Sequence, residues 1–234
     1  MPELALSGYY FLSKKELMRT AIFIKEKSLP RLVKLAAFRD MAIAVGFPEI
    51  DGEEIYNSAA FITPEREIRI YRKMHLFDSE KLVFSRASSG FPVFEYRGAK
   101  IGMLICFDHF FPEAARTLAL NGAEIICHCA NLVIPEKAQL TTRVRAIENG
   151  IYWIMSNRTG LEINDNKTVK FTGGSHIVAP DGEILVHADE KSQGCAVMDV
   201  DPNIARDKNI NERNNLFEDR RPDFYQFNPS INKN

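Results

Sequence analysis

Two stretches near the start of the chain have the pattern of amphipathic helices. Ser13 and Glu16 have the spacing of a capping box, and they predict a helix that runs to about residue 26. Ser28 and Pro30 predict the start of a second helix. The apolar positions of this second helix recur at helical spacing: Leu29, Leu32, Val33 and Ala36.

Short apolar runs typical of strands follow, together with two more helical segments. One helical segment is 112–121, with Pro112 in its first turn. The other begins at Pro135 and places an apolar stripe on one face: Leu140, Val144 and Ile147. The runs that predict strands are 41–47, 59–63, 67–71, 93–96, 101–105, 123–129, 151–156, 177–179, 184–187 and 195–200. This alternation of helices and strands indicates an α/β layered domain.

Cys106 lies where an uncharged strand, 101–105, gives way to the helix that begins at Pro112. A side chain at such a turn projects from the edge of the sheet, beside free backbone N–H groups and the positive end of the helix dipole. These groups lower the pKa of a thiol and can stabilise an oxyanion. Taken alone, Cys106 is equally compatible with a buried structural cysteine.

Glu3, Lys73 and Glu80 supply the other groups that acyl transfer needs. A carboxylate can act as a base, an ammonium can stabilise an oxyanion, and a thiol is the nucleophile. The alternative for Lys73 and Glu80 is a solvated cluster of surface charges, because Arg72, Asp78 and Lys81 are neighbours in the sequence.

Composition limits the class of protein. The chain has 234 residues, is 45% hydrophobic and carries a net charge of −1, so nothing in its charge favours nucleic acid or anionic lipid as a partner. No apolar run approaches a membrane span. Four cysteines in a chain of this length do not form a disulfide scaffold, which favours a reducing cytoplasm. No Gly-rich phosphate loop is present, and we expect no cofactor.

Cys127, His128 and Cys129 invite a metal-binding interpretation, but their spacing is not that of a zinc site and no second ligand pair follows. As part of a strand, the two cysteines face one side and His128 faces the other. We therefore expect structural or pocket-lining roles and no metal.

The segments around Glu3, Lys73 and Cys106 resemble those of the nitrilase superfamily of carbon–nitrogen hydrolases, in order and in context. Further matching strings run along the chain: Gly46-Phe47-Pro48-Glu49, Tyr56-Asn57-Ser58, Ala130-Asn131, Phe171-Thr172-Gly173-Gly174-Ser175, Pro180-Asp181-Gly182 and Asp219-Arg220-Arg221-Pro222. The resemblance implies a four-layer α-β-β-α sandwich of two stacked mixed sheets with outer helices. It also implies one domain at 1–207, a tail at 208–234 that packs on a neighbouring subunit, and a homo-oligomer built from dimers.

The resemblance further implies a mechanism. Cys106 attacks an amide or nitrile carbon and forms a thioester, and Glu3 is the general base. Lys73 and the Phe107 backbone N–H hold the oxyanion, and Glu80 orients the substrate and supports Lys73. The expected reaction is release of ammonia from a small amide or carbamoyl compound. The alternatives are a nitrilase and an inactive scaffold or partner subunit.

Substrate selectivity is implied less directly. His109 and Asn131 are expected to line the pocket, with an apolar contribution from Leu132 and Val133. Relatives that grip a substrate carboxylate often have an arginine near position 109, so His109 argues against N-carbamoyl amino acids as substrates.

Members of this family have a strand and a helix before the segment that corresponds to Pro2-Glu3, and here that segment opens the chain. We therefore expect a truncated start. Because chain ends fray, we also expect Glu3 to be poorly positioned.

Overall fold

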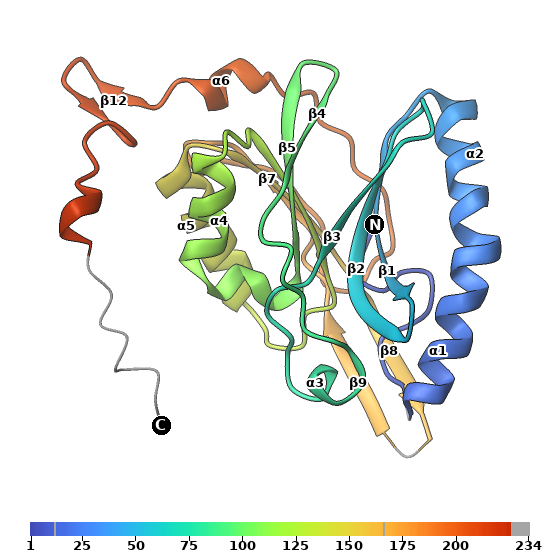
Figure 1. Ribbon diagram of the computed structural model, residues 1–234. Helices are drawn as coiled ribbons and strands as arrows, with labels where there is room; N and C mark the ends of the chain where they lie inside the picture. Colours follow the sequence, from blue (N-terminus) through green and yellow to red (C-terminus); the bar gives the residue numbers. More distant parts are fainter. Residues whose placement is uncertain (12, 166, 226–234) are drawn as a thin grey trace.

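The computed structural model, which describes residues 1–11, 13–165 and 167–225, has four layers (Figure 1). Helices α1 (Lys14–Phe23) and α2 (Leu29–Arg39) cover a small sheet, which stacks on a larger one. Helices α4 (Pro112–Leu120) and α5 (Lys137–Asn149) cover the far face of the larger sheet. The predicted α/β fold with layered sheets and outer helices is therefore confirmed.

The first two helices form one continuous helical rod, because a π-helical turn at Ile24–Ser28 joins α1 to α2. The predicted helix start is confirmed, since the Ser13 side chain caps it by accepting a hydrogen bond from the backbone N–H of Glu16. The predicted second helix begins where expected, at Leu29, with Pro30 in its first turn, although it continues directly from the π-helical turn. Ser28 has helical backbone angles and caps nothing, because the apolar stripe continues through Ile24 onto the sheet and the helix has no reason to end.

The smaller sheet has the strand order β1-β2-β3, with β1 at Ile43–Asp51, β2 at Glu54–Ile62 and β3 at Ile68–Arg72. It is antiparallel throughout, a detail that differs from the mixed sheet implied by the resemblance. The larger sheet is mixed and has the order β11-β10-β7-β6-β5-β4, with β5, β6 and β7 parallel. Its strands are β4 Val93–Tyr96, β5 Ala99–Ile105, β6 Ile125–Ala130, β7 Tyr152–Asn157, β10 His176–Val178 and β11 Ile184–His187.

Some elements had no clear pattern in the sequence. They are the short helix α3 (Glu80–Val83), the hairpin β8 (Thr159–Asn164) with β9 (Lys167–Thr172), helix α6 (Pro202–Arg206), and the short pair β12 (Asn209–Asn211) with β13 (Asn214–Asn215). The strand predicted at 195–200 was wrong. These residues form no strand and Val197 is 85% exposed, because no described strand lies beside the segment to take its backbone hydrogen bonds.

Apolar side chains fill the space between the two sheets. Phe61 and Tyr71 from the smaller sheet pack with Met103 and Ile105 of β5 in the main core. The parallel strands β5 and β6 both end at the same edge of this core, at Ile105 and Ala130. That edge carries the candidate site.

The tail predicted at 208–234 is described as far as residue 225; residues 226–234 lie outside the described part of the chain. Its first half packs on the chain's own helices, since Arg116 of α4 lies over the Phe217 ring. In the described part of the chain, no helix has the length and apolar character to cross a membrane.

Candidate active site

Cys106 lies at the turn predicted for it, between β5 and a short 3-10 turn (Cys106–Phe110) that leads into α4. Its φ is +41°, a left-handed conformation that is strained for a residue with a side chain. The buried Asp108 carboxylate holds this turn. It accepts hydrogen bonds from the Ile105 backbone N–H at 2.9 Å and from the Tyr71 hydroxyl at 2.7 Å.

Glu3 is fully buried and held at several points, so the expectation that it would be poorly positioned was wrong. The Met1 ammonium donates to the Ala44 carbonyl at 2.7 Å, and the Gly46 N–H donates to the Pro2 carbonyl at 3.1 Å. These bonds attach the first residues to the edge of β1. Fraying of the chain start would break them, so they oppose it. The Asn131 side chain also donates to the Glu3 carbonyl at 2.8 Å.

Lys73, directly after β3, joins two buried carboxylates. Its Nζ lies 2.7 Å from Glu3 Oε1 and 2.8 Å from both oxygens of Glu80. Lys73 is 1% exposed and Glu80 is 4% exposed, so the solvated charge cluster considered as an alternative is excluded. Glu80 also accepts hydrogen bonds from the Tyr9 hydroxyl and the Phe77 N–H.

Burial shifts the pKa values of this cluster. It raises the pKa of Glu3 to about 7, although the Lys73 charge acts in the opposite direction and Glu80 adds to the rise. Burial also disfavours the charged form of Lys73, but the two carboxylates outweigh it and raise the pKa of the ammonium above its ordinary value. Lys73 therefore stays charged beside a carboxylate that can exchange a proton near neutral pH.

The pKa of the Cys106 thiol is raised well above its ordinary value by burial and by the Glu3 charge. The lowering expected from the turn was therefore wrong in its net direction. Lys73 and a hydrogen bond from the Asn131 backbone do lower this pKa, but by less. The resting residue is a thiol, and it needs a base to become a nucleophile.

A small pocket opens onto Cys106 and has a cavity volume of about 20 Å³, close to the space that one water molecule needs. The residues that line it are Phe77, Cys106, Phe107, His109, Phe110, Asn131, Leu132, Val133, Ile134 and Lys137. The predicted pocket positions of Phe107, His109 and Asn131 agree with this lining. Burial lowers the pKa of His109 to about 4, so its ring is neutral, and its Nδ1 lies 2.6 Å from the Thr141 hydroxyl.

Three oxygens at the site have no hydrogen-bond partner among the described residues: Glu3 Oε2, Asn57 Oδ1 and Asn131 Oδ1. Buried acceptors without partners are costly in a folded protein, and they often mark a place that a ligand completes. Asn131 lines the pocket with Cys106, and the Glu3 charge acts on the Cys106 thiol. Asn131 Oδ1 and Glu3 Oε2 are therefore the candidate acceptors for an N–H of a substrate amide.

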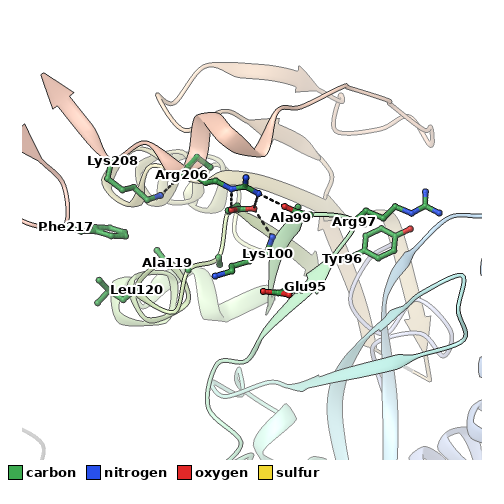
Figure 2. Close-up of a pocket in the computed structure, with 15 residues that line it drawn as sticks. Glu95, Tyr96, Arg97, Ala99, Lys100, Ala119, Leu120, Arg206, Lys208 and Phe217 are labelled. Carbon is green, nitrogen blue, oxygen red and sulfur yellow. Dashed lines mark hydrogen bonds and ion pairs between the residues drawn. The ribbon is translucent and has the colours of Figure 1, made fainter.

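A larger cavity of about 680 Å³ lies elsewhere, between the β4–β5 hairpin, the end of α4 and the segment around α6 (Figure 2). Two of the cations that line it already have partners. Arg206 pairs with Glu124, and Lys208 donates to the Asn149 and Gly150 carbonyls. No cysteine, serine or histidine lines it, so its size does not make it a catalytic site. In the described part of the chain, no three His, Cys, Asp or Glu side chains form a metal site.

Sequence reasoning missed several residues that build the site. Asn57 donates to Glu3 Oε1 at 2.7 Å. Tyr9 donates to Glu80, and Asp108 holds the turn at Cys106. Asn57 and Tyr9 lie within segments that carried the family resemblance, but nothing in their spacing indicated a partner. The available signal for Asp108 was an acidic residue two positions after the cysteine, at the strand-to-helix turn.

Comparison with known proteins agrees with this geometry. The sequence profile of the carbon-nitrogen hydrolase family matches residues 1–209. This chain belongs to that family. It is 41% identical to a nitrilase of Pyrococcus abyssi over 226 residues, which covers 96% of this chain and 84% of the relative. It is 34% identical to the N-carbamoylputrescine amidase of Arabidopsis thaliana, covering 94% of this chain and 79% of the relative.

Among solved structures, an amidase mutant from Nesterenkonia sp. AN1 superposes with a TM-score of 0.69 at 27% identity, covering 82% of this chain and 75% of the other. That structure shows acrylamide added to an active-site cysteine. With the family shown, the chain is a carbon–nitrogen hydrolase of the amidase and nitrilase type, as the resemblance implied.

Proposed function

We propose that this carbon–nitrogen hydrolase is an amidase that releases ammonia from a small amide or carbamoyl compound, with Cys106 as nucleophile. The observation that carries the proposal is the buried Glu3 carboxylate, which is bound to Lys73 through one oxygen and has no hydrogen-bond partner among the described residues at the other. A base with a pKa of about 7 next to a protonated thiol is the arrangement that thiol activation needs.

In the first half of the reaction, the Cys106 sulfur attacks the amide carbon while Glu3 takes the thiol proton. The oxygen of the tetrahedral intermediate becomes negatively charged and accepts hydrogen bonds from Lys73 and from the Phe107 N–H. Glu3 returns its proton to the nitrogen, the C–N bond breaks, and ammonia leaves a thioester on Cys106.

In the second half, Glu3 removes a proton from water as the water oxygen attacks the thioester carbon. The same donors hold the second oxyanion, the C–S bond breaks, and the proton returns to sulfur. Lys73 can serve in both halves if one of its three hydrogen bonds, which go to Glu3 Oε1 and to both Glu80 oxygens, is exchanged for a bond to the oxyanion. Glu80 keeps the ammonium in place and opposes its loss of charge.

The pocket favours a small and mostly apolar acyl group. Aromatic and aliphatic side chains make up most of its lining, and His109 is neutral. Asn131 Oδ1 and Glu3 Oε2 supply acceptors for an amide NH₂ group. We therefore place small aliphatic amides first and N-carbamoyl compounds second.

Incubation with a panel of aliphatic amides, carbamoyl compounds and nitriles, with ammonia as the readout, tests the proposal. We expect turnover of at least one amide by the wild type and none above background by Cys106→Ala. Cys195→Ala is the matched control, because Cys195 is exposed and outside the site, and it should keep full activity. Ammonia release that persists unchanged in Cys106→Ala would refute the mechanism, and turnover of nitriles alone would make the protein a nitrilase.

We also propose that the enzyme is a cytoplasmic homodimer, or a multiple of dimers. All four cysteines are free, which suits a reducing compartment. The outer face of α5 exposes the apolar side chains predicted as its stripe: Leu140 at 66%, Val144 at 40% and Ile147 at 45%. A second copy that packs on this face by a twofold axis would bury them, and the tail from residue 208 lies near enough to α4 and α5 to join that interface.

A further inference from the structure

His128, in the middle of β6, lies behind the cysteine turn and is 1% exposed. Its Nε2 is 3.0 Å from the carbonyl oxygen of Cys106. On the other side of the ring, the Trp153 indole N–H points at Nδ1, at 3.3 Å. The ring therefore connects the backbone of Cys106 to a buried tryptophan of β7.

These two contacts determine which nitrogen of the His128 ring carries the hydrogen. An indole N–H is only a donor, so His128 Nδ1 has to be the acceptor and Nε2 has to carry the hydrogen. Burial lowers the pKa of His128 well below its ordinary value, and the nearby His109, His176 and Lys73 act in the same direction. A neutral ring with its hydrogen on Nε2 donates to the Cys106 carbonyl.

That carbonyl shares a peptide group with the N–H of Phe107. In a planar trans peptide, the C=O and N–H bonds point in opposite directions. A hydrogen bond that holds the Cys106 oxygen toward His128 therefore turns the Phe107 N–H away from His128. Phe107 and Cys106 both line the pocket, where the oxyanion forms.

The turn needs such a restraint. Cys106 has a φ of +41°, and a residue with a side chain stays there only when its surroundings hold it. Asp108 restrains the turn by accepting a hydrogen bond from the N–H of Ile105, the residue before Cys106. Among the described contacts, His128 is the side chain that bonds the peptide after Cys106, the Cys106–Phe107 peptide, whose N–H the reaction would use.

We infer that His128 is a positioning residue, which sets the direction of the Phe107 N–H for the oxyanion, and that Trp153 selects the histidine tautomer able to do so. The inference rests on the proposed roles of Cys106 and Phe107. It gives His128 a part in the reaction without contact to the substrate.

The test compares His128→Phe, which keeps a buried ring but has no donor, with His128→Gln, whose amide N–H₂ can replace Nε2–H. We expect His128→Phe to lower kcat about 10- to 100-fold, less than the roughly 100- to 1000-fold loss when an oxyanion donor is removed, because the donor is displaced and not lost, with KM changed less than about threefold. His128→Gln should recover most of this loss. His176→Phe is the control, because His176 is also buried and neutral but bonds Thr142.

Two reagents distinguish an effect on the oxyanion donor from an effect on the reactivity of the Cys106 thiol. The aldehyde that corresponds to the best amide substrate adds to a thiol, and the oxygen of the adduct occupies the oxyanion position. Iodoacetamide alkylates the sulfur with loss of iodide and needs no such donor. His128→Phe should weaken aldehyde binding in proportion to kcat and leave the rate of Cys106 alkylation within about threefold of the wild type.

Three results would overturn the inference: a folded His128→Phe with normal kcat, a loss of alkylation equal to the loss of aldehyde affinity, or a His128→Gln no better than His128→Phe. If His128→Phe does not fold, nitrogen NMR of the wild type decides, with the His128 signals assigned by their absence from His128→Gln. A neutral ring with its hydrogen on Nδ1 would contradict the inference. Activity that survives in Cys106→Ala would instead refute the proposed function itself.

Discussion

Glu3 has one carboxylate oxygen held by Lys73 and Asn57, while its other oxygen has no partner among the described residues. A pKa of about 7 makes this group half ionised at neutral pH, and burial is the main reason. The thiol that it serves has a raised pKa and stays protonated at rest. The proton therefore moves to Glu3 only as the sulfur attacks, which couples activity to the ionisation of one carboxyl.

This coupling predicts the acid side of the pH profile. Only the ionised form of Glu3 can accept the thiol proton, so kcat/KM should rise about tenfold per pH unit below pH 7 and level off above it. Because the Glu80 charge raises the pKa of Glu3, Glu80→Gln should move the midpoint to lower pH and reduce kcat/KM. Profiles measured on both proteins check this.

Glu49→Gln is the control for that experiment. Glu49 also pairs with a cation, Arg72, but it lies outside the cluster of Lys73, and its loss should leave the midpoint unchanged. A kcat/KM that stays flat between pH 5 and pH 9 in the wild type would contradict the assignment of Glu3 as the base.

At the scale of elements, strand β1 positions Glu3 by backbone contact. Residues 2–4 lie so close to Gly46 that a Cβ there would be 2.5 Å from both Glu3 Cα and the Leu4 nitrogen. The Pro2 carbonyl accepts from the Gly46 N–H at the same place. The string Gly46-Phe47-Pro48-Glu49 supported the family resemblance, and the structure gives its glycine a physical role.

Gly46→Ala should therefore push the start of the chain away from β1 and displace Glu3. We expect kcat/KM to fall about 100-fold, since a shift of about 1 Å in a catalytic group has an effect of that size. Gly194→Ala is the control, because Gly194 has no atom within 4 Å of the added Cβ. Steady-state kinetics on the two variants check the expectation, and normal activity in Gly46→Ala would contradict it.

The elements that could be predicted from the sequence are those whose pattern is local. The strand before Cys106 and the helix after it needed only an apolar run and a proline. The failures depended on partners distant in the sequence. Residues 195–200 form a mostly apolar run like that of a strand but have no described neighbour to pair with. The two predicted helices join into one rod across Ser28, because a sheet supports them on both sides of that residue.

The same distinction holds for the site. Residue type and order identified Glu3, Lys73, Glu80 and Cys106, and the structure brings the three charged groups together. The roles of Asn57 and His128 depend on contacts across 54 and 22 positions of the chain, which no spacing rule contains. The direction of the Cys106 pKa also failed, because it depends on burial by the whole fold.

At the scale of the whole molecule, the exposed apolar face of α5 predicts self-association. Light scattering at micromolar concentration should give the mass of a dimer or a larger even assembly, above the 26.6 kDa of one chain. Leu140→Glu should shift the protein toward monomer, because it places a charge in the interface. Leu161→Glu, on the exposed β8–β9 hairpin, should not. A wild type that is strictly monomeric would contradict the proposed interface.

The proposed reaction depends on a covalent bond to one sulfur. Excess enzyme should be mixed with the best aliphatic amide, quenched with acid during the first turnover, and analysed by peptide mapping with mass spectrometry. We predict an acyl group on the peptide that contains Cys106, with Cys127, Cys129 and Cys195 unmodified. Ammonia release in that turnover with the acyl group on another residue, or undiminished release by Cys106→Ala, would contradict the account.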